Sequence, residues 1–151
     1  MTSWRETTSQ QAQDDLDTLL TLTLPFAQQQ LAEHGEFFPF AAAVGADGTP
    51  TLIGADPSLG EHPASVDVLN QLVGGLQEQA GNLRAAALVA DVRAGTSDAV
   101  RVELEHRDGQ AIRALLPYKR KRLRRGIDYG ELVAAPGSQR IWPGSEANPG
   151  F

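Results

Sequence analysis

The chain contains no cysteine, which excludes disulfide bonds, zinc–thiolate sites and thiol catalysis. It also lacks long apolar runs, because no stretch approaches the roughly 20 apolar residues of a membrane-spanning helix. The first residues, Met1–Glu6, are polar and include no apolar signal-peptide core. Together these absences predict a cytoplasmic protein that does not engage a membrane.

Catalytic motifs are missing as well. The sequence has no G-x-S-x-G elbow, no P-loop and no dinucleotide fingerprint. His34, His62 and His106 lie far apart, and none has a partner at the spacing of a metal site, so we expect structural roles for them. We therefore expect no metal, no cofactor and no catalytic residue. An enzyme remains an alternative, because a site assembled from scattered residues leaves no motif.

Positive charge is scarce outside one window. Residues 1–118 carry 6 basic and 16 acidic side chains, whereas residues 119–151 carry 7 basic and 3 acidic ones. We name residues 119–125 the basic run. Its cations are the main candidate binding residues: Lys119, Arg120, Lys121, Arg122, Arg124 and Arg125.

The basic run has three interpretations. It could bind an acidic protein surface or grip the phosphates of a nucleic acid. It could also be a solvated turn that balances nearby carboxylates and protects an exposed sheet edge. Nucleic acid is the less favoured partner, because the acidic remainder of the chain would repel a polyanion from most directions.

Length and composition indicate a single domain. We expect a flexible lead-in over residues 1–9, one domain over 10–135, and a loosely ordered tail over 136–151 that Ile141 and Trp142 could pin to the body. Arginine outnumbers lysine 11 to 2, and alanine and glycine are abundant, which suggests a bacterial source.

The first half of the chain predicts two helices and a hairpin. Leucines at helical spacing predict a helix over 10–34, with a kink or a junction of two helices at Pro25 and a cap at Gly35. Strands follow over 36–44 and 51–54, joined at the Asp47-Gly48 turn. A second helix is expected over 64–80, with Val66 in its apolar stripe. Close packing on the sheet would offset the helix-weakening pair Gly74-Gly75.

The second half predicts an antiparallel meander over residues 84–118 with a tight turn at Asp108-Gly109. Glu103 and Glu105 should share its wet face, and Pro117 should end its last strand. One more short strand is expected over 127–133. The fold class is thus α+β and two-layer, with two main helices on an antiparallel sheet of about five strands in the order α-β-β-α-β-β-β. This order is similar to that of roadblock-type and profilin-like domains, without a shared motif.

The expected core includes six residues of these stripes: Leu20, Leu31, Leu69, Leu76, Val102 and Leu104. Asp14, Asp15 and Asp17 are interpreted as carboxylates that favour the first helical turns. Strand alternation puts Phe38 and Phe40 on one face and Phe37 on the other. If the Phe37 ring is exposed it would anchor an interface, so Phe37 joins the candidate binding surface.

The sequence therefore favours a small cytoplasmic interaction or regulatory domain that binds another protein, a homodimer included. The first alternative is a polyanion or nucleic-acid binder that uses the basic run. The second is an enzyme whose site no motif reveals.

Overall fold

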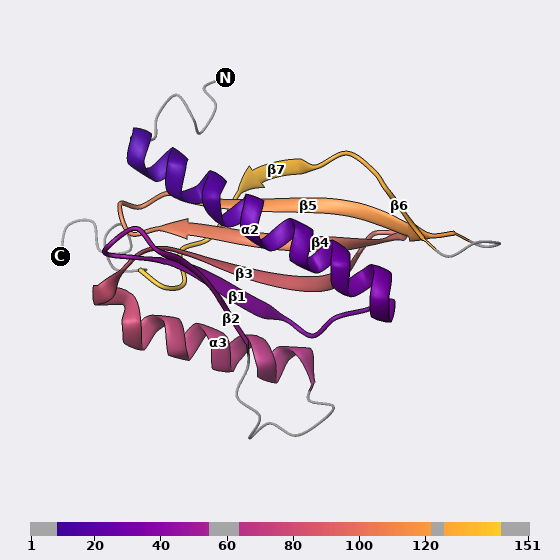
Figure 1. Ribbon diagram of the computed structural model, residues 1–151, viewed down its shortest axis with the longest axis horizontal. Helices are drawn as coiled ribbons and strands as arrows, with labels where there is room; N and C mark the ends of the chain where they lie inside the picture. The colour runs from indigo at the N-terminus through magenta and orange to yellow at the C-terminus, as the bar shows by residue number, and fades with distance from the viewer. Residues whose placement is uncertain (1–8, 55–63, 122–125, 143–151) are drawn as a thin grey trace.

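Two helices and a curled antiparallel sheet form the part of the chain that the computed structural model describes, residues 9–54, 64–121 and 126–142 (Figure 1). The elements in chain order are α2 (Gln10–His34), β1 (Phe40–Gly45), β2 (Pro50–Ile53), α3 (Ser65–Gln79), the 3-10 helix η2 (Ala80–Asn82), β3 (Leu83–Ala94), β4 (Ser97–His106), β5 (Ala111–Arg120), β6 (Ile127–Tyr129) and β7 (Val133–Pro136). The α+β class with two main helices is confirmed. The strand count is slightly higher than expected, because the predicted strand over 127–133 is replaced by β6 and β7.

The sheet runs in the order β2-β1-β3-β4-β5-β6, and β7 also pairs with β5. Both expected hairpin turns are present: Asp47-Gly48 joins β1 to β2 and Asp108-Gly109 joins β4 to β5. Gly48 and Gly109 have φ angles of 89° and 111°, a left-handed conformation that glycine adopts without a Cβ penalty. The meander over residues 84–118 is confirmed as β3, β4 and β5. This order leaves β2 at one edge of the sheet.

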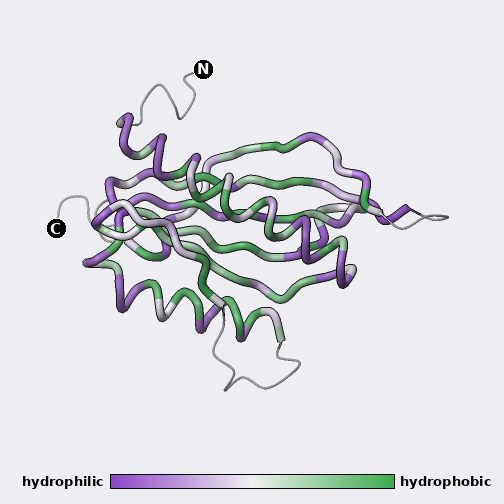
Figure 2. The backbone as a smooth tube through the Cα atoms, viewed as in Figure 1, coloured by the Kyte–Doolittle hydropathy of each residue, from purple (hydrophilic) through white to green (hydrophobic). Residues whose placement is uncertain are grey.

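Alternate side chains divide the sheet into two faces. One face, here the α2 face, packs against α2 and includes Val89, Val102 and Leu104. The other, the α3 face, packs against α3 and includes Ala41, Ala43 and Leu88 along its apolar part. The strands β1 and β3 are therefore covered on both sides, and Figure 2 shows hydrophobic stretches running through the sheet.

Most of the expected core is buried. Leu31, Leu76, Val102 and Leu104 are confirmed as buried, whereas Leu20 and Leu69 are only partly buried at the margins. The predicted stripe of the second helix is wrong at its start. Val66 is exposed and Val68 is buried instead, since the stripe of α3 runs through Val68, Leu72 and Leu76.

Two expectations about proline are corrected by the structure. Helix α2 continues through Pro25 as one helix, so two abutting helices are not formed. β5 continues through Pro117 to Arg120 rather than ending there. Pro117 is tolerated because it lies between the two outer ladders of β5, where β7 pairs with residues up to Leu115 and β6 pairs from Tyr118 onward.

Both ends of α2 are capped as its sequence favours. The Ser9 hydroxyl accepts a hydrogen bond from the Ala12 N–H, and Gly35 adopts a left-handed conformation with a φ of 77°. No helix within the described ranges combines the length and the apolarity needed to cross a membrane.

Candidate functional site

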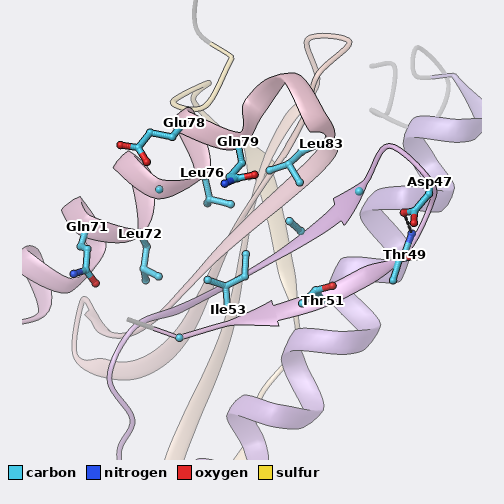
Figure 3. Close-up of a pocket in the computed structure, with 14 residues that line it drawn as sticks. Asp47, Thr49, Thr51, Ile53, Gln71, Leu72, Leu76, Glu78, Gln79 and Leu83 are labelled. Carbon is cyan, nitrogen blue, oxygen red and sulfur yellow. Dashed lines mark hydrogen bonds between the residues drawn. The ribbon is translucent and has the colours of Figure 1, made fainter. Parts of the chain in front are cut away.

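A groove of about 930 Å³ lies between the edge strand β2 and helix α3 (Figure 3). Its apolar floor comes from both walls and from β1 and β3: Ala43, Ile53, Leu72, Leu76 and Leu83. Its polar lining is Asp47, Thr49, Thr51, Gln71, Glu78 and Gln79. The groove combines an apolar base with polar walls, which is the usual make-up of a binding site in proteins.

Strand alternation supplies the β2 wall of this groove. Thr51 and Ile53 point to the α3 face, whereas Leu52 points to the α2 face and is 38% exposed. Leu72 and Leu76, one helical turn apart on α3, reach toward the strand from the opposite wall, as Figure 3 shows. Because α3 packs mainly on β1 and β3, with Ile53 of β2 partly buried at the margin, space stays open over the rest of β2.

The outer edge of β2 offers backbone groups for pairing. The Gly45 N–H donates to the Thr49 carbonyl, so these residues form a hydrogen-bonded pair at the start of the hairpin. Inward and outward backbone groups alternate along an antiparallel ladder. Leu52 therefore directs its N–H and its carbonyl away from β1, while Pro50 directs only a carbonyl outward.

The lining of the groove has one sign of charge. Asp47 and Glu78 are acidic, and the lining contains no Lys, Arg or His. The Thr49 N–H donates to the Asp47 carboxylate over 3.0 Å, and this hydrogen bond holds the pKa of Asp47 below its ordinary value. The positive charge of Arg84 also lowers the pKa of Asp47, which is ionised at neutral pH.

The glycine pair of α3 does not have the packing role that its sequence suggested. A Cβ built at Gly74 or at Gly75 would have no neighbouring heavy atom within 4 Å. Close packing on the sheet is therefore wrong as the reason for these glycines. Gly75 lines the groove, and sequence reasoning missed the groove because its walls are far apart in the chain.

The described part of the basic run lies at the opposite edge of the sheet. Lys119 and Arg120 end β5 and Lys121 follows, all exposed, whereas Arg122, Arg124 and Arg125 lie outside the described residues. Arg120 lies 3.4 Å from Asp98 and donates a hydrogen bond to the Gly35 carbonyl.

Lys121 of the basic run also has a carboxylate nearby, because its Nζ lies 3.6 Å from the Asp128 carboxylate. Arg120 also places its guanidinium 5.6 Å from the centre of the Tyr118 ring. These contacts tie the start of the run to neighbouring groups of the same chain.

The three clustered phenylalanines occupy different environments. Phe40 is buried in the core, and Phe37 is partly buried with its ring centre 5.7 Å from that of Phe40. Phe38 is the most exposed of the three at 48%. It borders a smaller cavity of about 400 Å³ beside His34 and Asp91.

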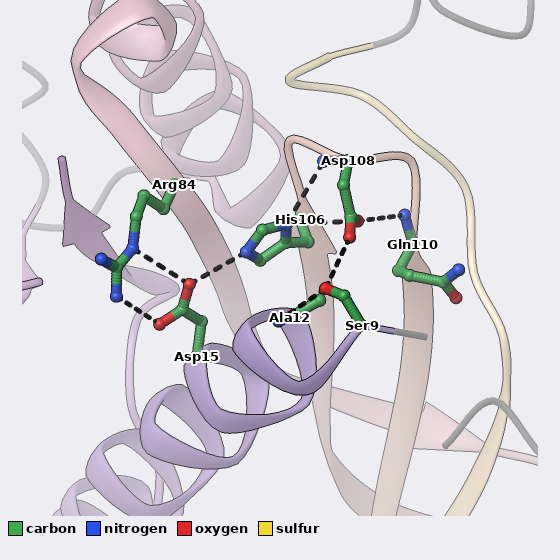
Figure 4. A network of polar contacts seen from close by, with 7 residues as sticks. All are labelled: Ser9, Ala12, Asp15, Arg84, His106, Asp108 and Gln110. Carbon is green, nitrogen blue, oxygen red and sulfur yellow. Dashed lines mark hydrogen bonds and ion pairs between the residues drawn. The ribbon is translucent and has the colours of Figure 1, made fainter. Parts of the chain in front are cut away.

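A buried polar network joins α2 to the sheet (Figure 4). The Asp15 carboxylate accepts two hydrogen bonds from Arg84, at 2.7 and 3.1 Å, and lies 2.9 Å from His106 Nε2. His106 Nδ1 lies 3.2 Å from the Asp108 carboxylate.

This network corrects the interpretation of Asp15 as a residue that merely favours the helix start. Asp15 is 4% exposed and His106 is 3% exposed, so neither can meet a substrate. The ion pair between Asp15 and Arg84 and the contact between Asp15 and His106 fasten the helix to β3 and β4. Because these side chains are buried and join α2 to two strands of the sheet, we assign the network a structural role.

A second buried carboxylate lies on the α3 face. Glu105 was expected on a wet surface, but it is 5% exposed. It accepts hydrogen bonds from the backbone N–H groups of Arg140, Ile141 and Trp142 at 2.6 to 3.0 Å. The segment over residues 138–142 is thereby held against the sheet. The apolar pair Ile141 and Trp142 suggests this attachment, whereas the Glu105 contact has no local sequence signal because its partners lie more than 30 residues away.

Comparison with protein-family models, with curated proteins and with solved structures gives no match to this chain. The candidate site therefore depends on geometry alone.

Proposed function

We propose that this chain is a protein-interaction domain and that its binding site is the groove between β2 and α3. The observation that carries the proposal is an apolar floor left open beside the edge strand of the sheet. Another chain that binds beside this strand edge can bury apolar surface and form backbone hydrogen bonds at the same time. We also propose that the protein is cytoplasmic, as its sequence predicts.

The occupant of the groove is an extended segment of a partner protein. Such a segment would pair with Leu52 through its backbone and place alternate side chains over Thr51 and Ile53 toward α3. Backbone pairing supplies affinity and the pockets for alternate side chains supply selectivity. Four residues of β2 limit the paired length, so we expect moderate affinity.

The groove gives a better basis for the function than the basic run. Arg120 and Lys121 contact Asp98 and Asp128, which supports the interpretation of these charges as a balance for carboxylates of the same chain. Pairing of this kind reduces what the described cations could offer to phosphates. A polyanion binder is thus the less supported alternative, and an enzyme remains the second alternative.

Selection from a random peptide display library tests the proposal, with Thr51→Arg as the groove-blocked control. Thr51 is exposed, so the long arginine side chain can project into the groove without disturbing the core. We expect peptides that bind the wild-type protein and lose affinity for Thr51→Arg. Equal binding to both proteins, or no enrichment at all, would overturn the proposal.

A second copy of the chain is the alternative occupant that native mass spectrometry separates from a partner peptide. A monomer at micromolar concentration agrees with the proposal. A dimer that Thr51→Arg dissociates would assign the groove to self-association and overturn the proposal of a separate partner.

A further inference from the structure

We infer that the groove selects an extended segment with a Lys or Arg side chain, and that this segment lies against the backbone of α3 at Gly75. The inference rests on the proposed function and specifies its ligand. It draws on two independent observations, the glycine pair of α3 and the charge of the groove lining.

Glycine is unfavourable in the interior of a helix, because it loses more backbone freedom on folding than any other residue. α3 nevertheless carries Gly74 and Gly75 in its second half. Neither residue has a positive φ, so an L-residue could adopt the same conformation. Nothing within 4 Å of an added Cβ would obstruct alanine at either position.

The described chain itself thus gives no reason for glycine at position 75. The difference between the two glycines lies in their surroundings, because Gly75 is among the residues that line the groove and Gly74 is not. A methyl group at Gly75 would project into the space of the groove. A molecule that fills this space and approaches the helix backbone supplies the missing reason, since only glycine permits such close approach.

The charge of the lining defines the chemistry of that molecule. Asp47 lies at the β1–β2 turn and Glu78 lies on the exposed side of α3, so an exposed carboxylate stands at each margin of the groove (Figure 3). The lining offers no cation to pair with an acidic ligand. An extended segment that alternates apolar and basic side chains satisfies both the floor formed by Leu72 and Leu76 and these carboxylates.

The test uses fluorescence anisotropy with two labelled seven-residue peptides, in which valine alternates with lysine or with glutamate. Wild-type protein should bind the lysine peptide about tenfold or more tightly than the glutamate peptide. Asp47→Asn should weaken binding of the lysine peptide by up to about fivefold, the effect of one exposed ion pair. Equal affinity for both peptides overturns the inference.

The glycine pair provides a matched control within the same helix. Gly75→Ala should weaken binding of the lysine peptide about tenfold, because the added methyl group would occupy space that the bound peptide needs beside the α3 backbone. Gly74→Ala should leave binding unchanged. Both variants should raise the melting temperature, which shows that a loss of binding in Gly75→Ala does not come from misfolding. Equal binding by Gly75→Ala and Gly74→Ala contradicts the inference.

The outcomes separate this inference from the proposed function. The display library could yield peptides that bind wild type and lose affinity for Thr51→Arg but carry no basic residue. Such peptides would overturn the inference and leave the proposed interaction domain intact. Failure of every peptide to bind would overturn both. Displacement of the lysine peptide by micromolar spermidine would assign the groove to small polyamines and overturn the choice of a peptide ligand.

Discussion

On the α2 face of the sheet, one long helix encloses a continuous apolar core, whereas the α3 face joins a smaller apolar patch to charged groups and to an open groove. Each face holds one buried carboxylate. Asp15 on the α2 side meets the charged partner Arg84, while Glu105 on the α3 side meets uncharged backbone N–H groups. The difference indicates that the α2 face supplies most of the stability, whereas the α3 face leaves an apolar surface open at the groove.

The largest effect should follow from the loss of the Asp15 carboxylate. Asp15→Ala leaves Arg84 without its ion pair and His106 without its acceptor, so we expect the free energy of unfolding to fall by about 3–5 kcal/mol. Urea denaturation measures the change. Asp14→Ala, at an exposed neighbouring position, is the control and should cost less than about 1 kcal/mol. A similar small loss for Asp15→Ala would show that the network contributes little.

Two leucines test whether the faces differ in apolar packing. Leu104→Ala on the α2 face should cost about 2–5 kcal/mol. Leu76→Ala should cost less, because Leu76 lines the groove and water can fill the space that it vacates. Urea denaturation of both variants checks this order. A loss below about 1 kcal/mol for Leu104→Ala, or a larger loss for Leu76→Ala, would contradict the comparison.

The Glu105 carboxylate should matter more for one segment than for the whole fold. In Glu105→Gln one acceptor oxygen becomes an amide that faces N–H donors, so we expect a loss of about 1–3 kcal/mol. Hydrogen exchange should accelerate most at the amides of residues 140–142. Glu33→Gln, at an exposed position on α2, is the control and should leave that exchange nearly unchanged. Uniform acceleration across the sheet would contradict a local role.

The smallest effect concerns a tyrosine on the α2 face. The Tyr118 hydroxyl donates to Asp91 over 2.5 Å, and burial together with this carboxylate raises the pKa of Tyr118 above its ordinary value of 10.0. The unfolded chain therefore loses this proton first as pH rises. The free energy of unfolding should start to fall as the pH passes about 10, the pKa of an unfolded tyrosine, and should go on falling up to the raised pKa of the folded state, by at most about 1.4 kcal/mol per pH unit for one proton.

Tyr118→Phe should make this decline shallower, as urea denaturation at several pH values would measure. The pKa of Tyr129 is also raised by burial, so Tyr129→Phe is the comparison variant. Burial raises the pKa of Tyr129, whereas burial and the Asp91 carboxylate both raise that of Tyr118, so Tyr129→Phe should alter the decline less than Tyr118→Phe does. An unchanged slope in Tyr118→Phe would show that its proton does not contribute.

Local patterns predicted the elements that depend on nearby residues. The dipeptides Asp47-Gly48 and Asp108-Gly109 correctly predicted both hairpin turns. The alternation of Val100, Val102 and Leu104 predicted that these side chains share one face, and all three lie on the α2 face. These features could be predicted because strand alternation and turn geometry are encoded over a few neighbouring residues.

The features that escaped prediction depend on contacts between distant segments. Glu105 looked like a residue of a wet face because its N–H donors lie at 140–142. Pro117 looked like a strand end because the break between β6 and β7 is not visible in the sequence. The groove could not be predicted either, since only the crossing of α3 over the sheet brings Gly75 and Thr51 to the same cavity.

Pro50 gives the edge of the sheet a further property. A strand edge with a full row of donors and acceptors can template the addition of strand after strand and lead to fibres. Because Pro50 has no N–H, Leu52 supplies the one outward-facing N–H donor within β2 itself. A strand that pairs with this edge therefore meets few hydrogen-bond donors. The edge can therefore accept a short segment in the groove while giving little support to the runaway sheet growth that leads to aggregation.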